Sequence, residues 1–522
     1  MALKLLYNVK LVKIYGSAVF GINSTLITIE TGISAGINFH LVGLPDSAVK
    51  ESQQRISTAL IANNYKIPQK KVVINMAPAD IRKEGAAYDL PLAVGLLAAS
   101  EQIPDADLEN YIIMGELALD GKLRPIKGAL PMAIMARERG FKGFILPEEN
   151  AMEAAVVDKL DVYGVNTLRE VVDFFDGRNP ITPVKVNTRE QFYKNVTAVD
   201  VDFSDVRGQE NVKRAMEIAA AGGHNIIMIG PPGAGKTMLA KRLASIIPPL
   251  TLHEALETTK IHSVAGKMER NSGLISTRPF RSPHHTISDV ALVGGGTFPQ
   301  PGEISLAHNG VLFLDELPEF RRNVLEVMRQ PLEDRKIVIS RAKFTVEYPA
   351  SFMLVASMNP CPCGYYNHPE KKCLCPPGAV KKYLARISGP LLDRIDMHIE
   401  VIPVPFAKLA ESAVSENSTS VRERVIKARE IQRTRFENNR GIYCNAMMTT
   451  TLLRKYCELD EVGAKTIKMA MERLGLSARA YDRILKVSRT IADLADSEGI
   501  LPRHLAEAIN YRNLDREGWA GS

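Results

Sequence analysis

The sequence predicts a multidomain protein with an α+β N-terminal domain, an α/β core and a helical C-terminal region. Its length of 522 residues is more than one hydrophobic core usually organises, so two to four domains are expected. Short apolar runs alternate with helical patterns at residues 201–404, as buried parallel strands and their covering helices do. From residue 405 onward, apolar residues recur only at helical spacing.

The composition is that of a folded chain. Apolar residues make up 45% and charged residues 24%, which argues against a disordered or fibrous protein. A net charge of +7 is modest for this length and favours a polyanionic partner only slightly. Residues 1–16 alternate like a strand and lack the apolar stretch of a signal peptide or membrane helix. We therefore expect a cytoplasmic protein with no membrane partner.

Four regions follow from these patterns. Residues 1–175 mix alternating strands with short helices and are expected to form a separate α+β domain. Residues 176–200 are polar, contain proline and show no sustained period, so we interpret them as a linker. The α/β core is placed at 201–404 and a small helical bundle at 405–522.

A glycine-rich segment in the core points to a phosphate-binding loop. It follows the apolar run IIMI and precedes the helical pattern MLAKRLASII, which is the strand–loop–helix context of this motif. Backbone N–H groups of such a loop cradle phosphate oxygens, the lysine adds a positive charge, and the threonine hydroxyl binds Mg²⁺. ATP and Mg²⁺ are the expected ligands. The motif comprises Gly230, Pro231, Pro232, Gly233, Ala234, Gly235, Lys236 and Thr237.

A second apolar strand, VLFL, ends in two carboxylates, Asp315 and Glu316. Paired with a phosphate loop, this pattern predicts that Asp315 holds Mg²⁺ through water. Glu316 is then the candidate base that polarises the attacking water, because that role needs a carboxylate not committed to the metal. Together the two motifs predict an ATPase.

The core resembles an AAA+ domain, with GPPGAGKT and LFLDE as its paired nucleotide motifs. The resemblance implies further roles. Asn359, after the run LVASM, matches the sensor-1 position, which orients the water. Arg394, within LLDRID, matches an arginine finger that acts on the neighbouring subunit, and Arg479, within LSARAYDR, matches sensor 2. A trans-acting finger implies a ring, here a homo-hexamer; for either arginine the alternative is an exposed salt bridge.

More narrowly, the chain resembles the YifB/ComM family of magnesium-chelatase-like ATPases over nearly its whole length. The supporting motifs are FHLVGLPDSAVKES, PFRSPHHTISDVALVGGG and NPCPCG followed by CLC. The resemblance implies an ATP-driven, helicase-like or branch-migration motor on single-stranded or branched DNA, with a role in natural transformation. The alternatives are a chelatase-like or protein-remodelling ATPase that does not act on DNA, and a scaffold whose assembly ATP hydrolysis resets.

Basic residues in two segments are candidate DNA contacts. The segment KIVISRAKFTVEY has two β-rich arms about a short tip and resembles the pre-sensor-1 hairpin, so Arg341 and Lys343 are expected to face a ring pore; a solvated tip is the alternative. Residues 278–296, with Arg281, lie where this branch carries a helix-2 insertion. They form either a second pore loop or a structural loop. The pair His284–His285 could instead indicate a metal site or a catalytic base, although adjacent side chains diverge on most backbones.

Four cysteines lie within one short loop of the core. Their thiolates are soft ligands that suit a structural Zn²⁺ site with no open coordination position. Reduced buried thiols and redox pairing are the alternatives. The four residues are Cys361, Cys363, Cys373 and Cys375.

The N-terminal domain resembles the proteolytic domain of Lon-type proteases, in the ChlI-type form. The nucleophilic serine expected after Glu84-Gly85 is replaced by Ala86 and Ala87, and Leu130 stands where the lysine belongs. Without nucleophile and base there is no catalytic dyad. We interpret the domain as an inactive relative that binds a protein partner or gates the ring.

Overall fold

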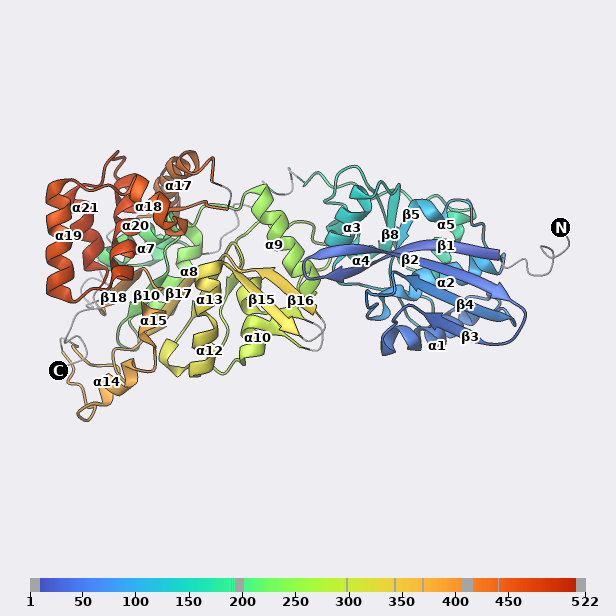
Figure 1. The fold of residues 1–522 in the computed structure, drawn as a ribbon, viewed down its shortest axis with the longest axis horizontal. Helices are drawn as coiled ribbons and strands as arrows, with labels where there is room; N and C mark the ends of the chain where they lie inside the picture. Colours follow the sequence, from blue (N-terminus) through green and yellow to red (C-terminus); the bar gives the residue numbers. More distant parts are fainter. Residues whose placement is uncertain are drawn as a thin grey trace. The chain divides into compact units, whose positions relative to one another are not determined.

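The computed structural model describes residues 10–188, 190, 192, 201–296, 299–341, 344–368, 370–404, 416–439 and 441–512. The chain forms two compact units (Figure 1). Unit 1 comprises Met1–Val196 and Thr251–Ser276, and unit 2 comprises Thr197–Leu250 and Thr277–Ser522. The segment Thr251–Ser276 thus packs in unit 1, although its sequence position lies inside the range 201–404.

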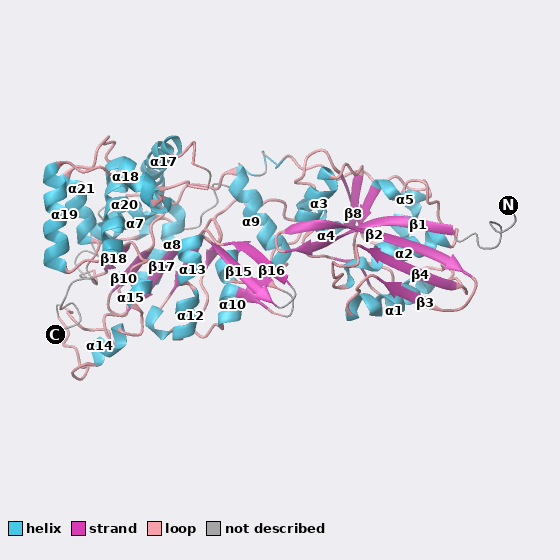
Figure 2. Cartoon of the chain, viewed as in Figure 1, coloured by secondary structure: helices cyan, strands magenta, loops and turns pink. Residues whose placement is uncertain are grey.

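Unit 1 is built on a seven-stranded mixed sheet with strand order β3-β4-β2-β1-β5-β8-β9 (Figure 2). Strands β1 and β2 form a long antiparallel hairpin, while β5, β8 and β9 run parallel. The strands are β1 (Lys10–Phe20), β2 (Asn23–Ser34), β3 (Phe39–Val42), β4 (Lys71–Ala77), β5 (Tyr111–Ile113), β8 (Gly143–Pro147) and β9 (Asp161–Val165), with a separate pair β6 (Glu116–Leu117) and β7 (Leu123–Arg124).

The helices of unit 1 cover this sheet. Every residue of α2 is buried, as its nearly unbroken apolar sequence predicts, and the helix packs on β1 and β2. Helix α9 begins at a capping box on Thr251 and packs on α3, where Gly128 N donates to Ser263 O at 3.1 Å. The helices are α1 (Ser47–Ala62), α2 (Asp89–Ala99), α3 (Ala129–Glu138), α4 (Glu148–Ala154), α5 (Leu168–Phe175) and α9 (Leu252–Ala265).

Unit 2 contains a five-stranded parallel sheet with order β11-β14-β17-β10-β18. All residues of β10, β14 and β17 are buried, which explains their continuous apolar sequences. The expected mixed α/β fold with a parallel sheet is therefore confirmed. The strands are β10 (Ile226–Ile229), β11 (Phe280–Arg281), β14 (Val311–Leu314), β17 (Met353–Met358) and β18 (Met397–Glu400).

Helices surround this sheet and continue to the end of the described chain. Helices α17 and α20 both pack on α7. The helices are α7 (Glu210–Gly222), α8 (Lys236–Ile246), α10 (Asp289–Val293), α11 (Glu303–Leu306), α12 (Arg322–Val327), α13 (Arg329–Asp334), α14 (Ala379–Leu384), α15 (Gly389–Leu392), α17 (Ser418–Arg435), α18 (Thr450–Tyr456), α19 (Glu461–Leu474), α20 (Ala478–Leu494) and α21 (Pro502–Asn510).

Two short hairpins project from unit 2. One pairs β12 (Gly294–Gly295) with β13 (Gln300–Pro301), and the other pairs β15 (Lys336–Arg341) with β16 (Phe344–Pro349). Short 3-10 helices occur at Ala86–Tyr88, Leu108–Asn110, Phe203–Asp205, Leu317–Glu319 and Asn445–Met447. Across the described residues, no helix combines the length and apolar character needed to cross a membrane.

Candidate nucleotide-binding site

The phosphate loop connects buried strand β10 to helix α8, as the sequence predicts. Its start, Gly230, has no room for a side chain, because an added Cβ would lie 2.3 Å from Val401 O. Its end, Gly235, has φ +87° and precedes the first residue of α8. Only glycine adopts this left-handed conformation readily. The loop therefore places the N-terminus of α8 beside the carboxyl edge of the sheet, where phosphates are bound in such folds.

Lys236 is held by oxygen atoms of the loop and of the neighbouring strand. Its Nζ donates to Gly230 O at 2.7 Å, to Pro231 O at 3.0 Å and to Asn359 Oδ1 at 3.1 Å. Burial lowers the pKa of Lys236, and Asp315 and Glu316 act in the opposite direction. The ammonium group thus lies at the site where β and γ phosphates are expected, and phosphate oxygens are stronger partners for it than peptide carbonyls.

Asp315 connects three elements of the site. Thr237 Oγ1 donates to Asp315 Oδ2 at 2.7 Å, Ser357 Oγ donates to Asp315 Oδ1, and Glu316 N donates to the same Oδ1 at 3.1 Å. The hydrogen bond between the Thr237 hydroxyl and Asp315 fits a site in which the hydroxyl would bind Mg²⁺ and Asp315 would hold the ion through water.

Glu316 has a strained backbone and an open carboxylate. Its φ of +54° is left-handed, a conformation that is uncommon for residues other than glycine. The side chain is 55% exposed, and Oε2 lies 3.8 Å from His285 Nδ1. The His285 ring also stacks on His284, with centroids 4.1 Å apart. The sequence singles out His285 only as half of a histidine pair, and nothing in the local pattern predicts that it lies beside Glu316.

Asn359 completes the group. It follows β17, which lies between β10 and β14 in the sheet, so its side chain reaches the loop that β10 carries. Parallel strands end at the same edge, which explains why three distant sequence segments meet here. The structure thus brings together Lys236, Thr237, Asp315, Glu316 and Asn359 as the motifs predicted.

The two arginines assigned from the AAA+ resemblance form ion pairs in unit 2 with residues outside the phosphate loop. Arg394 is buried, with Nη2 2.5 Å from Glu333 Oε1 and Nη1 donating to Pro390 O at 2.5 Å. Arg479 is 59% exposed, with Nη1 3.7 Å from Asp393 Oδ2. Since Asp393 and Arg394 are consecutive, both arginines gather at the segment after α15. Their ion pairs do not join the phosphate loop.

Arg394 also lines a cavity of about 490 Å³ formed mainly by α12, α13 and β15. Acidic Glu326 and Glu333 and basic Arg329 contribute to its wall. Arg329 Nη1 donates to Glu326 Oε2 at 2.8 Å. The charged side chains in the cavity wall are thus paired with one another, Arg329 with Glu326 and Arg394 with Glu333.

Asp396 fixes the arginine segment to the sheet and to α20. Its Oδ2 accepts from Asn225 N at 2.8 Å, and its Oδ1 accepts from Arg483 Nη1 at 2.9 Å. Burial opposes the charged form, yet the guanidinium of Arg483 and the hydrogen bonds to His224 and Asn225 hold the pKa of Asp396 well below its usual range. The segment is therefore rigidly anchored next to Arg394.

The candidate DNA contacts differ in their surroundings. Arg281 Nε and Nη2 donate to both carboxylate oxygens of Glu303, at 2.6 and 2.8 Å, and this hydrogen bonding raises the pKa of Arg281. Its guanidinium is thus committed to a bidentate pair within unit 2. Arg341 ends β15 at the hairpin tip, and Lys343 lies outside the described residues.

The four cysteines predicted as a zinc site lie together. Their Sγ atoms are all within 4.8 Å of one another. The distances are 3.3 Å for Cys361–Cys363, 3.7 Å for Cys361–Cys373 and 3.5 Å for Cys363–Cys373. None of the four forms a disulfide.

In unit 1, the residues at and near the positions of the expected protease dyad are buried and hydrogen-bonded. Leu130 is fully buried, and its N donates to Glu153 Oε1 at 2.9 Å. Tyr88 is also buried and donates to Ser17 O at 3.0 Å. Burial raises the pKa of Glu84 to about 7. Ala86, Ala87 and Leu130 stand at the positions where the resemblance to Lon-type proteases led us to expect a nucleophile and a base.

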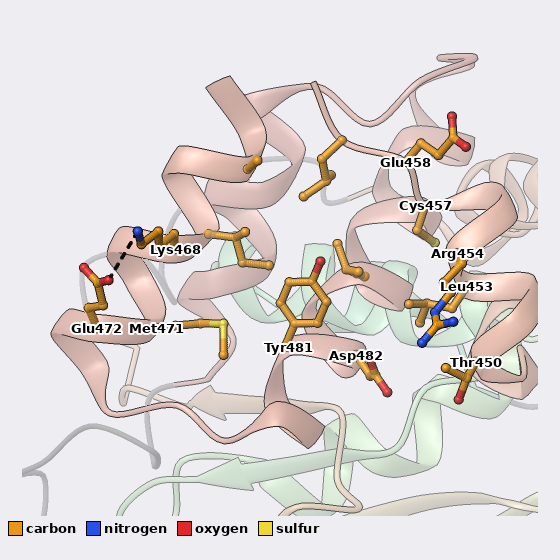
Figure 3. A pocket seen from close by; sticks show the side chains of 14 residues that line it. Thr450, Leu453, Arg454, Cys457, Glu458, Lys468, Met471, Glu472, Tyr481 and Asp482 are labelled. Atoms are coloured by element: carbon orange, nitrogen blue, oxygen red, sulfur yellow. Dashed lines mark ion pairs between the residues drawn. The ribbon is translucent and has the colours of Figure 1, made fainter. Parts of the chain in front are cut away.

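A larger cavity, about 810 Å³, lies among α18, α19 and α20 (Figure 3). It is lined by apolar residues such as Leu453, Met471 and Tyr481, with a Lys468–Glu472 ion pair at its edge. None of the residues predicted for the nucleotide site lines it.

Three family models match the chain. The model "Magnesium chelatase, subunit ChlI" matches residues 202–409, "Subunit ChlI of Mg-chelatase" matches 29–150, and "Magnesium chelatase, subunit ChlI C-terminal" matches 415–512. The first contains the phosphate loop, both carboxylates and Asn359. A Lon protease 2 from Bacillus subtilis is 28% identical over 178 residues, covering 30% of this chain and 32% of that protein.

Two relatives match along nearly their entire lengths. The competence protein ComM of Haemophilus influenzae is 45% identical over 505 residues, which is 96% of this chain and 97% of that protein. The YifB protein of Salmonella typhimurium is 44% identical with the same coverage. The nucleotide site, the chelatase-type models and these alignments agree: the chain belongs to the YifB/ComM family of magnesium-chelatase-like AAA+ ATPases.

Proposed function

We propose that the protein is the subunit of a homo-hexameric ring motor that uses ATP hydrolysis to drive branch migration or helicase-like unwinding of DNA. The observation that carries the ATPase part is the convergence of Lys236, Thr237 and Asp315 at one sheet edge. The DNA part is supported by the relative named as a competence protein. Single-stranded or branched DNA is the proposed substrate, handled during recombination of incoming DNA in the cytoplasm.

Each residue of the site has a defined task in hydrolysis. Lys236 and the loop N–H groups bind the β and γ phosphates, and Thr237 and Asp315 hold Mg²⁺, which supplies positive charge to those phosphates. Glu316 accepts a proton from the attacking water, which its exposed carboxylate can reach. Asn359 orients that water or the γ-phosphate from β17. His285 keeps the Glu316 side chain in place.

The ring is proposed from the position of Arg394. Arg394 pairs with Glu333 on α13 and not with the phosphate loop of its own chain, so we assign its guanidinium to the phosphate of a neighbouring subunit. On assembly, Arg394 exchanges Glu333 for the incoming phosphate. Arg479, which pairs with Asp393 next to Arg394, is proposed to act as sensor 2 and to reach the γ-phosphate from the C-terminal helices. AAA+ proteins are commonly oligomeric, which agrees with this assignment.

DNA is proposed to contact the tip of the β15–β16 hairpin. Arg341 and Lys343 supply charges that bind phosphates without reading sequence, as a translocating motor requires. Arg281 is the weaker candidate because Glu303 already neutralises it. A structural Zn²⁺ on the four cysteines joins ATP and Mg²⁺ as the third proposed ligand.

A protein-remodelling ATPase is the second candidate function. The match of residues 29–150 to a chelatase-subunit model favours it, since unit 1 lacks a protease dyad and remains available for a protein partner. Both candidates share the nucleotide site, so the substrate separates them.

ATP turnover of the purified protein with single-stranded, duplex and four-way-junction DNA, at two salt concentrations, tests the proposal. Strong stimulation that weakens at higher salt supports the DNA motor, because phosphate contacts release counterions. Turnover that no DNA changes would contradict it and favour the remodelling function. No turnover under any condition would remove the ATPase assignment.

A further inference from the structure

The four-cysteine segment touches the phosphate loop directly. We call residues 361–375 the cysteine turn; it begins two residues after Asn359. At Gly364, whose φ is +84°, an added Cβ would lie 2.4 Å from Pro232 Cδ and 2.8 Å from Pro232 Cγ. The backbone of the turn therefore packs closely on the phosphate loop, and a glycine is needed at that position.

The sulfur geometry matches a tetrahedral metal site. With Zn–S bonds of about 2.3 Å, the sulfurs of a Zn(Cys)₄ site are about 3.8 Å apart. The three distances of 3.3, 3.7 and 3.5 Å lie near this value and far above the roughly 2.05 Å of a disulfide. Cys375 Sγ lies within the same 4.8 Å cluster. All four ligands come from a single turn.

Little else stabilises the cysteine turn. Among its described residues only Cys361 and Gly364 are buried, and Leu374 is 84% exposed, so the turn has no apolar core. Local contacts among its described residues include Gly364 N to Cys361 O at 3.0 Å and the Lys371 ammonium 4.9 Å from the Tyr365 ring centroid. Segments without a core are ordered by metals or disulfides, and no disulfide is present among these cysteines.

The charge balance also suits a metal–thiolate centre. Zn²⁺ binding to four cysteines displaces four thiol protons and leaves a centre of net charge −2. Lys371 and Lys372 precede Cys373 in the same turn, and Lys381 and Lys382 follow in α14. Four positive charges thus lie close to the cysteines along the chain.

We propose that Zn²⁺ bound by Cys361, Cys363, Cys373 and Cys375 seats the cysteine turn on Pro232 and thereby fixes the phosphate loop for nucleotide binding. Metal occupancy would then set ATP affinity, although the metal touches neither phosphate nor Mg²⁺. The coupling runs through two short connections: Gly364 contacts Pro232, and Asn359, just before the turn, bonds Lys236. The inference rests on the nucleotide site proposed above.

Metal analysis and fluorescent-ATP titration of full-length protein, purified under reducing conditions, test this inference. Wild type is expected to hold one zinc per chain. Cys373→Ser is expected to lose the zinc and to bind nucleotide about tenfold more weakly. The control Cys457→Ala, in which the altered cysteine lies outside the cluster, is expected to retain both properties.

A second variant separates the metal from the contact. Gly364→Ala is expected to keep its zinc yet bind nucleotide more weakly, because the added methyl displaces the turn from Pro232. Removing zinc from wild type with a chelator and restoring it should lower and recover affinity, which avoids dependence on the folding of variants. Iron in place of zinc, or well under one metal per chain, would overturn the inference.

Unchanged nucleotide affinity after zinc loss would overturn it equally. By contrast, zinc-loaded wild type that binds no nucleotide would remove the nucleotide site itself. The two failures are therefore distinguishable in the same titration.

Discussion

Asn359 Oδ1 accepts a hydrogen bond from Lys236 Nζ at 3.1 Å, joining the residue after β17 to the first residue of α8. This bond links the strand proposed to sense the γ-phosphate to the loop proposed to bind it. A bound phosphate must replace or share the bond, because both side chains are directed at the same place. We therefore expect nucleotide binding at the loop to be coupled to the neighbouring strand, from which the cysteine turn begins.

Substitutions at Lys236 and Glu316 should separate binding from hydrolysis. Lys236→Ala removes the ammonium group and is expected to weaken ATP binding at least about tenfold. Glu316→Gln keeps the shape but not the base, so affinity should persist while kcat falls about 100-fold or more. Fluorescent-nucleotide titration and steady-state turnover measure the two effects, with the exposed Glu461→Gln as control. Undiminished kcat in Glu316→Gln would exclude Glu316 as the base.

His285 should affect catalysis through Glu316. His285→Ala leaves the Glu316 carboxylate without its neighbour at 3.8 Å, so kcat is expected to fall several-fold with little change in KM. His285→Gln should restore part of the loss because it retains a polar contact. His284→Ala is the matched control, since His284 Nδ1 lies 2.9 Å from Thr286 Oγ1 instead. Equal kcat values for the two alanine variants would contradict the positioning role.

Arg394 should act across a subunit interface. Arg394→Ala alone is expected to bind ATP but to lose about 10³-fold in kcat, the usual value of an arginine finger. Mixing it with Lys236→Ala subunits should restore part of the activity, because some interfaces then pair an intact loop with an intact finger. Arg473→Ala, an exposed arginine on α19, is the control. Mixed rings that assemble yet remain as inactive as either parent would place Arg394 in its own subunit's site.

The hairpin tip should govern the response to DNA. The double variant Arg341→Ala/Lys343→Ala is expected to keep basal turnover and lose DNA stimulation, with a shallower salt dependence of about 0.7 per lost contact to single strands. The control variant Lys465→Ala/Lys468→Ala removes the same number of positive charges from helix α19 instead of from the hairpin. Stimulation retained by the hairpin variant but lost by the α19 variant would move the DNA site to the C-terminal helices.

The nucleotide site could be predicted because its signals are local. A buried apolar run followed by a glycine loop or by paired carboxylates predicts both the strand and the residue at which it ends. Parallel strands then bring those ends together at one edge of the sheet. The cysteine cluster followed in the same way from its spacing. Lys236, Asp315, Asn359 and Cys361 therefore lie where the motifs indicated.

Contacts between segments distant in the sequence could not be predicted, because no local sequence pattern marks them. The proximity of His285 to Glu316, the Arg281–Glu303 pair and the packing of Gly364 on Pro232 depend on tertiary arrangement. For the same reason the sequence does not show that Thr251–Ser276 packs in unit 1. Helix α9 has an ordinary capped sequence, and its membership of unit 1 is seen from its contact with α3.

The most direct test of the proposed motor is the ATP-driven dissociation of a fluorescently labelled four-way junction. Wild type is expected to resolve the junction into its duplex arms when ATP and Mg²⁺ are present, whereas Glu316→Gln should bind the junction and leave it intact. Vigorous ATP turnover by wild type, with the junction and a partial duplex both unchanged, would contradict a DNA motor and identify the protein as an ATPase with another substrate.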